Sequence, residues 1–91
     1  MRFSDIFSER LKTRRIERGF KTQKDFARAT GISIQAINFY ESGARKPEFV
    51  QLWKIADALN CSVDWLMGRS DNLGETPTTN DWILNRFMKA E

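Results

Sequence analysis

Two carboxamide side chains, Gln35 and Asn38, lie three residues apart in the segment TGISIQAINFYESG at positions 30–43. A carboxamide donates and accepts hydrogen bonds, and it can bond bidentately to the edge of an adenine. Ser33 is a favoured N-cap, so the segment predicts a helix over about residues 34–41. Residues three apart share one face of a helix, so both carboxamides are expected on the same surface.

The same predicted helix carries more apolar residues than one buried stripe requires. Ile37 and Tyr40 fit a single inward-facing stripe. Ile34 and Phe39 fall outside that stripe. We expect them on a surface that contacts another molecule, with the core as the alternative position for Phe39.

Catalysis and metal binding are not indicated. The chain has no histidine and one cysteine, Cys61, so neither an internal disulfide nor a zinc site is expected. It has no glycine loop of the kind that cradles phosphates. We therefore expect no enzymatic activity, no cofactor and no small-molecule ligand. No apolar run approaches the ~20 residues of a membrane helix, and the start MRFSDIFSER is too polar for a secretion signal. A cytoplasmic protein is expected.

Charge is distributed unevenly along the 91 residues. Residues 1–46 hold eleven Lys/Arg and five Asp/Glu, whereas residues 47–91 hold four Lys/Arg and seven Asp/Glu. This pattern favours a basic face for a polyanion, with a merely solvated surface as the alternative. Arg14 and Lys24 are expected to be ordinary solvated charges, with a contact to the polyanion as the alternative.

The periodicity predicts an all-α fold with no strand. Phe3, Phe7 and Leu11 form one stripe, and Ser4 is the expected N-cap of a first helix over residues 4–18. Thr22 precedes a second helix over 23–29, which Gly31 ends. Pro47 is expected at the first position of a fourth helix. This fourth helix carries an apolar stripe made of Phe49, Leu52, Ile55, Ala56 and Leu59, and Asn60 is its expected C-cap. Ser62 is the expected N-cap of a short fifth helix, VDWLMG, which Gly68 ends.

The C-terminal part has a different character. Residues 69–80, RSDNLGETPTTN, are polar and rich in turn formers, and we interpret them as a linker. Residues 81–91 predict a short amphipathic helix with Asn80 as its N-cap. A helix of about ten residues is marginal alone in water, so its apolar residues must be buried. They would pack on the same domain or on another subunit: Trp82, Ile83, Leu84, Phe87 and Met88.

Two short helices joined by a glycine turn indicate a helix-turn-helix. Ala27 is small enough for the second helix to cross closely, Gly31 supplies the turn, and Ile37 anchors the second helix. Over residues 7–68 the chain resembles the Cro/cI-type (XRE) helix-turn-helix family of phage and bacterial regulators. The segments RLKTRRIERGF, TQKDFA, GIS, INFYESGARKP, LWKIADALN and SVDWLMG follow that family's order and spacing.

The resemblance implies a five-helix, lambda-repressor-like domain over residues 1–68, with the helix-turn-helix at about 23–42, that binds double-stranded DNA as a dimer. It implies that the third helix enters the major groove. The residues expected to face the bases are Ser33, Ile34, Gln35, Asn38 and Phe39. Ile34 stands where the family often has a polar base reader, so we expect it to contact a thymine methyl group.

The resemblance also implies contacts that orient the domain on the DNA. The residues expected at phosphates are Thr22, Gln23, Ser42, Gly43, Arg45 and Lys46, with Gln23 contributing its side chain and its backbone N–H. Ser42 and Gly43 are expected to offer backbone N–H groups. Arg15 and Glu41 are expected to form an ion pair that fixes the third helix to the first.

A homodimer is expected because one recognition helix reads only a few base pairs. Its interface is expected to include Val63, Trp65, Met67, Trp82, Ile83 and Phe87, and Trp53 is expected to be partly exposed. Two functions remain open. The first is a sequence-specific transcriptional regulator, most simply a repressor on a palindromic operator. The alternative is a protein-interaction adaptor or antitoxin-like partner that retains the fold.

Overall fold

Five helices make up the described part of the chain, residues 3–75 of a computed structural model, and no strand occurs within it. They are α1 (Phe3–Glu17), α2 (Gln23–Thr30), α3 (Ile34–Ser42), α4 (Phe49–Leu59) and α5 (Val63–Leu66). The all-α prediction is confirmed. The expected helix at 81–91 lies outside the described residues, with Trp82, Ile83 and Phe87. No helix within residues 3–75 has the length and apolar character to cross a membrane.

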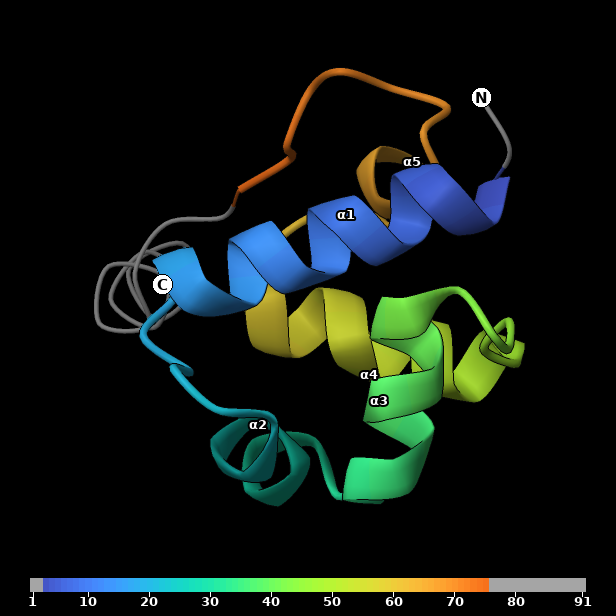
Figure 1. The fold of residues 1–91 in the computed structure, drawn as a ribbon. Helices are drawn as coiled ribbons and strands as arrows, with labels where there is room; N and C mark the ends of the chain where they lie inside the picture. The colour runs from blue at the N-terminus through green and yellow to red at the C-terminus, as the bar shows by residue number, and fades with distance from the viewer. Residues whose placement is uncertain (1–2, 76–91) are drawn as a thin grey trace, which may run out of the picture.

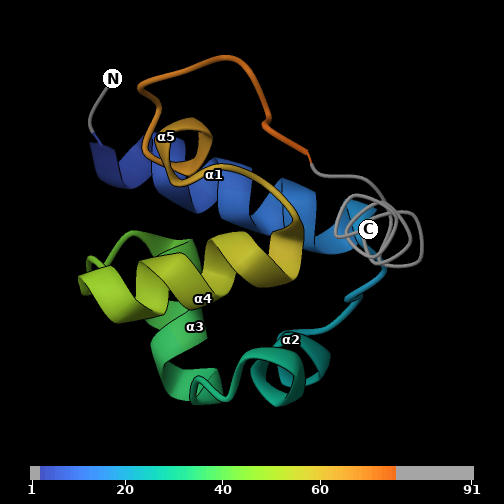
Figure 2. The ribbon, with the colours of Figure 1, turned by 180° about the vertical axis from the view of Figure 1, so that it is seen from behind.

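The helices surround one core. The helix α1 packs against α3, α4 and α5, while α2 packs against α3 and α4 (Figures 1 and 2). Each helix contributes at least one fully buried side chain, and the largest are Phe7, Leu11, Phe26, Ile37, Ile55, Leu59 and Leu66. Burying a large apolar side chain contributes about 1.5–3 kcal/mol, so this cluster fixes the arrangement of the five helices.

Local signals at the helix ends agree with most of the predicted boundaries. Thr22, Ser33 and Ser62 each accept a hydrogen bond from a backbone N–H in the first turn, as N-caps do. Gly31 ends α2 in the left-handed conformation, with φ 75°. That conformation is readily available to glycine, and it lets α3 cross α2 after a turn of three residues.

Two predicted helix starts are wrong. Ser4 lies inside α1 rather than before it. The helix α4 begins at Phe49, not at Pro47, because Glu48 is extended (ψ 166°) and interrupts the helical path. The proline ring fixes its own φ but not the backbone of the next residue. Phe49, expected in the core stripe, is 76% exposed at this helix start.

Residues 67–75 pass beside α1 instead of leaving the domain at Gly68 (Figure 1). The Ser62 N–H donates to Leu73 O at 2.8 Å, and Leu73 packs against the core. Arg10 donates to Ser70 O and to the carboxylate of Asp71. This first part of the expected linker is therefore built into the folded domain.

Candidate nucleic-acid interface

The helix α3 presents an exposed polar face next to its buried stripe. Ile37 and Tyr40 are buried, as expected. Gln35 and Asn38 are exposed, and Ile34 retains 46% of its surface. Ser33 Oγ accepts from the Ala36 N–H at 3.1 Å, which leaves the hydroxyl hydrogen available outside the helix. The face can therefore offer carboxamides, a hydroxyl and an aliphatic side chain to a ligand.

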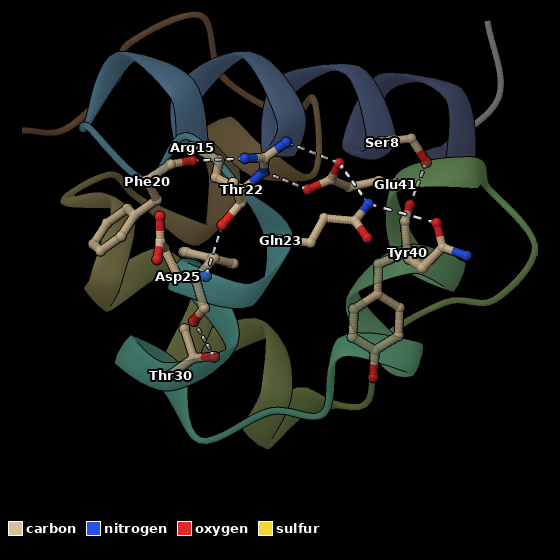
Figure 3. A network of polar contacts seen from close by, with 11 residues as sticks. Ser8, Arg15, Phe20, Thr22, Gln23, Asp25, Thr30, Tyr40 and Glu41 are labelled. Atoms are coloured by element: carbon tan, nitrogen blue, oxygen red, sulfur yellow. Dashed lines mark hydrogen bonds and ion pairs between the residues drawn. The ribbon is translucent and has the colours of Figure 1, made fainter.

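An ion pair fixes this face to α1. Arg15 Nε donates to Glu41 Oε2 at 2.7 Å, and both side chains are about 95% buried. Arg15 Nη1 also donates to Phe20 O at 2.6 Å, so the guanidinium joins α1, the loop after it and α3 (Figure 3). A buried pair specifies geometry more than it stabilises. The expected contact between Arg15 and Glu41 is present.

Gln23 ties the start of α2 to the same network. Its Nε2 donates to Glu41 Oε1 at 3.2 Å and to Asn38 Oδ1 at 3.5 Å. Figure 3 shows the Gln23 side chain pointing from α2 toward Glu41. Because Gln35 lies one turn before Asn38 on α3, Gln23 and the carboxamide face occupy the same side of the molecule.

The N-terminus of α2 is an exposed set of hydrogen-bond donors. Thr22 Oγ1 caps the Asp25 N–H at 3.1 Å. The N–H groups of Gln23 and Lys24, in the first turn, have no partner within the helix. Such N–H groups and the helix dipole suit an anion. The side-chain NH₂ of Gln23, expected at a phosphate, is instead used inside the protein, so its backbone N–H is the group that remains for that role.

The loop after α3 positions one arginine. The Arg45 guanidinium lies 4.6 Å from the centre of the Phe39 ring, a cation–π arrangement. Phe39 is half-buried, so its ring partly serves as a platform for Arg45. Burial raises the pKa of the Tyr40 phenol, and the charge of Arg45 opposes that rise. Arg45 and Lys46 are both exposed.

Ser42 and Gly43 mainly end α3. The Ser42 hydroxyl donates to Phe39 O at 3.1 Å, and the Gly43 N–H donates to Tyr40 O at 3.4 Å. Gly43 adopts φ 79°, which forms the left-handed cap. The Gly43 N–H that we expected at a phosphate is thus engaged within the chain, because the helix end must satisfy its last carbonyl groups.

Arg14 corrects a prediction from the charge pattern. We expected a solvated side chain, but it is 6% exposed. Its Nε donates to Leu59 O at 2.9 Å and its Nη2 to Glu75 at 2.8 Å. The hydrogen bond from Arg14 lowers the pKa of the Glu75 carboxyl. Sequence alone did not indicate this role, because the partners of Arg14, which include the backbone carbonyl of Leu59 and the carboxylate of Glu75, are distant in the chain.

The residues expected at a dimer interface are only partly available. Val63, Trp65 and Met67 are half-buried and pack against the core. Arg10 lies over the Trp65 ring at 4.9 Å, beside an open cavity of about 460 Å³. Val63, Trp65 and Met67 leave part of their surface exposed along α5 and directly after it.

A larger apolar surface lies at the start of α4, and we call it the α4 patch. It consists of Phe49, Val50 and Trp53, which are 76%, 53% and 60% exposed. The partial exposure expected of Trp53 is confirmed. Large exposed apolar patches mark interaction sites in soluble proteins. Phe49 was expected in the core stripe, and Val50 was not singled out in the sequence.

Comparison with known proteins identifies the family. Residues 11–66 match the model of the family described as Helix-turn-helix, which covers more than half of the chain. The chain therefore belongs to the helix-turn-helix family, the Cro/cI (XRE) type that the motifs indicated. No solved structure matches significantly.

Several bacterial and phage proteins are similar to this chain. The cryptic phage CTXphi transcriptional repressor RstR of Vibrio cholerae is 49% identical over 49 residues, which cover 54% of this chain and 44% of RstR. The uncharacterised HTH-type transcriptional regulator YqaE of Bacillus subtilis is 36% identical over 67 residues, covering 74% of this chain and 57% of YqaE. The uncharacterised HTH-type transcriptional regulator YazB of Bacillus subtilis is 36% identical over 63 residues, covering 69% of this chain and 90% of YazB. The chain thus spans about half the length of RstR and YqaE.

Proposed function

We propose that this chain is a cytoplasmic, sequence-specific regulator of transcription that binds double-stranded DNA, most simply as a repressor occupying an operator. The observation that carries the proposal is the hydrogen-bonded joint between α2 and α3. Gln23 contacts Asn38 and Glu41, and Arg15 holds Glu41 to α1. The joint holds an anion-binding helix start and an exposed carboxamide face in one rigid unit. Helix-turn-helix proteins use such a unit to bind a phosphate and the adjacent base edges together.

The role of each residue follows from its exposure and its remaining hydrogen bonds. Gln35 and Asn38 meet base edges in the major groove, while Ile34 contacts a thymine methyl group. The N–H groups of Gln23 and Lys24 bind one phosphate, and Arg45 and Lys46 bind the backbone beyond α3. With about six phosphates neutralised by a dimer, the slope of log K against log salt is about −5.

We further propose that two copies bind together, because a two-fold operator doubles the recognised sequence. The α4 patch supports this arrangement. It lies at the first turns of α4, directly after the loop 43–48 that joins α4 to α3. The exposed parts of Val63, Trp65 and Met67 add a second candidate surface. The name of RstR, a transcriptional repressor, supports repression over activation.

The proposal is tested by binding to duplexes selected from a random pool. Gln35→Ala is expected to lower affinity for the selected site by roughly 1–3 kcal/mol and to relax the choice at one base pair. Thr13→Ala, an exposed change on α1, is the control and is expected to bind as the unmodified protein does. Selection that enriches no sequence would refute a sequence-specific regulator.

The α4 patch also favours a second candidate, a protein-interaction adaptor that uses its apolar surface and not DNA. Gel shifts with random duplex at several salt concentrations separate the two functions. A DNA-binding domain retains salt-dependent affinity for random duplex, because most of that affinity comes from phosphates. An adaptor shows none.

A further inference from the structure

The backbone carbonyl of Phe39 organises the loop after α3. The Ala44 N–H donates to Phe39 O at 3.0 Å, and the Arg45 N–H donates to the same oxygen at 3.3 Å. The Ser42 hydroxyl adds a third hydrogen bond to it, at 3.1 Å. These three donors hold the backbone of Arg45 against the last turn of α3. The Arg45 side chain therefore starts from a fixed point near Phe39.

The ring of Phe39 contacts the face of the Arg45 guanidinium. The guanidinium carbon Cζ lies over the ring, 4.6 Å from its centre, within the ~6 Å range of a cation–π contact. Phe39 is half-buried and Arg45 is exposed, so a ring partly fixed by packing supports a charge at the surface. Burial raises the pKa of the Tyr40 phenol, and the charge of Arg45 opposes that rise, which places the guanidinium near a second aromatic residue of α3.

The edge of the same guanidinium is unused within the described residues. A guanidinium has five N–H donors in its plane. Within residues 3–75, the Arg45 side chain forms neither a hydrogen bond nor an ion pair, whereas Arg10, Arg14 and Arg15 each donate to partners in the chain. Contact with a ring uses the face of a guanidinium, and hydrogen bonds to a phosphate use its edge, so both can form together.

We propose that Phe39 is a positioning residue for DNA binding, whose ring holds the Arg45 guanidinium in place for a backbone phosphate. The inference rests on the proposed function, because it requires a DNA strand beside the loop 43–48. A long side chain loses rotamer freedom when it binds, and a ring that already restricts it in the free protein lowers that cost. Phe39 thereby acts on affinity for any duplex. This role differs from the base contact that the resemblance implied for Phe39.

The first experiment is a double-mutant cycle on binding to random duplex, with Phe39→Leu and Arg45→Ala alone and together. Phe39→Leu keeps an apolar side chain in the half-buried position but removes the ring. We expect it to weaken binding about 2-fold to 10-fold, the cost of ordering one long side chain, with an unchanged slope of log K against log salt. In the Arg45→Ala protein the same change should have no further effect, because the side chain that the ring positions is gone.

Lys46→Ala provides the matched control for this cycle. It removes the neighbouring exposed cation, which is not held over the Phe39 ring. Phe39→Leu should weaken binding by the same factor in the Lys46→Ala protein as in the unmodified one. An effect of Phe39→Leu that persists undiminished in the Arg45→Ala protein would overturn the positioning role, and so would a folded Phe39→Leu protein that binds like the unmodified one.

The second experiment changes the charge of the ring face and keeps the ring. Phenylalanines with an increasing number of ring fluorines are placed at position 39. They have nearly the same shape as Phe39, but each fluorine withdraws electron density from the face that attracts the cation. Affinity for random duplex should fall stepwise along the series with Arg45 present and stay constant in Arg45→Ala. A constant affinity with Arg45 present would overturn the inference, and this series decides the question if Phe39→Leu does not fold.

Selection from a random pool separates this inference from the function on which it rests. Phe39→Leu should enrich the same operator as the unmodified protein. Loss of preference at one base pair would show that Phe39 reads a base, which overturns the inference and leaves the DNA-binding regulator intact. Failure of the unmodified protein to bind any duplex would refute the regulator and the positioning role together.

Discussion

Removing the Glu41 carboxylate should be one of the most destabilising single changes on the proposed DNA-facing side of the domain. Glu41→Ala leaves the Arg15 guanidinium, whose side chain is only 6% exposed, with its bond to Phe20 O but without its counter-charge. Breaking a buried pair by deleting one partner costs about 3–5 kcal/mol. A domain of this size has a total unfolding free energy of only about 5–10 kcal/mol. The midpoint of thermal unfolding should therefore fall on the order of 15–30 °C.

The assay is urea unfolding followed by far-UV circular dichroism, with thermal unfolding as a second measurement. Glu17→Ala, which removes an exposed carboxylate from α1, is the matched control and should change the unfolding free energy by less than about 0.5 kcal/mol. The double variant Arg15→Met/Glu41→Leu removes both charges and should recover most of the loss, because burying the pair also costs desolvation. If Glu41→Ala lost no more stability than Glu17→Ala, the buried pair would not be the element that fixes α3 to α1.

Three further predictions follow from the same contacts. Arg45→Lys keeps the charge but loses the planar stacking on Phe39, so binding to all duplexes should weaken by about 0.5–1 kcal/mol while the salt dependence of binding stays unchanged. Arg45→Ala should also reduce the slope of log K against log salt by about 1. Binding titrations at several salt concentrations measure both effects. Burial raises the pKa of Cys61 from 9.0 to about 11, so the thiol ionises at lower pH in the unfolded chain than in the folded one. The contribution of the neutral thiol to stability is therefore complete below pH 9 and is lost as the pH rises toward 11. Urea unfolding midpoints should fall across that pH range. Trp53→Glu in the α4 patch should shift a dimer to monomer in sedimentation while Asp57→Ala, exposed on the same helix, does not; a Trp53→Glu protein as dimeric as the unmodified one would exclude this patch as the interface.

Local sequence signals predicted much of the fold, because they act over a few residues. N-caps such as Thr22 and Ser33 and the glycine turn at 31 depend only on their own backbone, and they lie where the pattern placed them. The predicted start of α4 at Pro47 was wrong, because it depends on more than such a local signal. The helix begins only after Glu48, whose backbone is extended, and Pro47 restricts its own φ but not the backbone of the residue that follows it.

The candidate site was predictable by position but not by the state of its hydrogen bonds. Sequence alone placed Gln23 and Asn38 on the proposed DNA face, but it assigned Gln23 to a phosphate and Asn38 to a base edge and paired Glu41 with Arg15 only. The structure shows that the carboxamide nitrogen of Gln23 is used by two residues of α3. Such a polarity depends on long-range packing, here on Arg15 from α1. Arg14 illustrates the same limit, since a buried and a solvated arginine look alike in sequence.

The proposed entry of α3 into the major groove is tested most directly by chemical interference on a selected operator. Methylating guanine N7 places a methyl group in the major groove without altering the minor groove. We predict loss of binding at guanines in two half-sites whose centres lie about 34 Å, one helical turn, apart. Binding that is unaffected by N7 methylation at every guanine of the selected site would contradict the entry of α3 into the major groove.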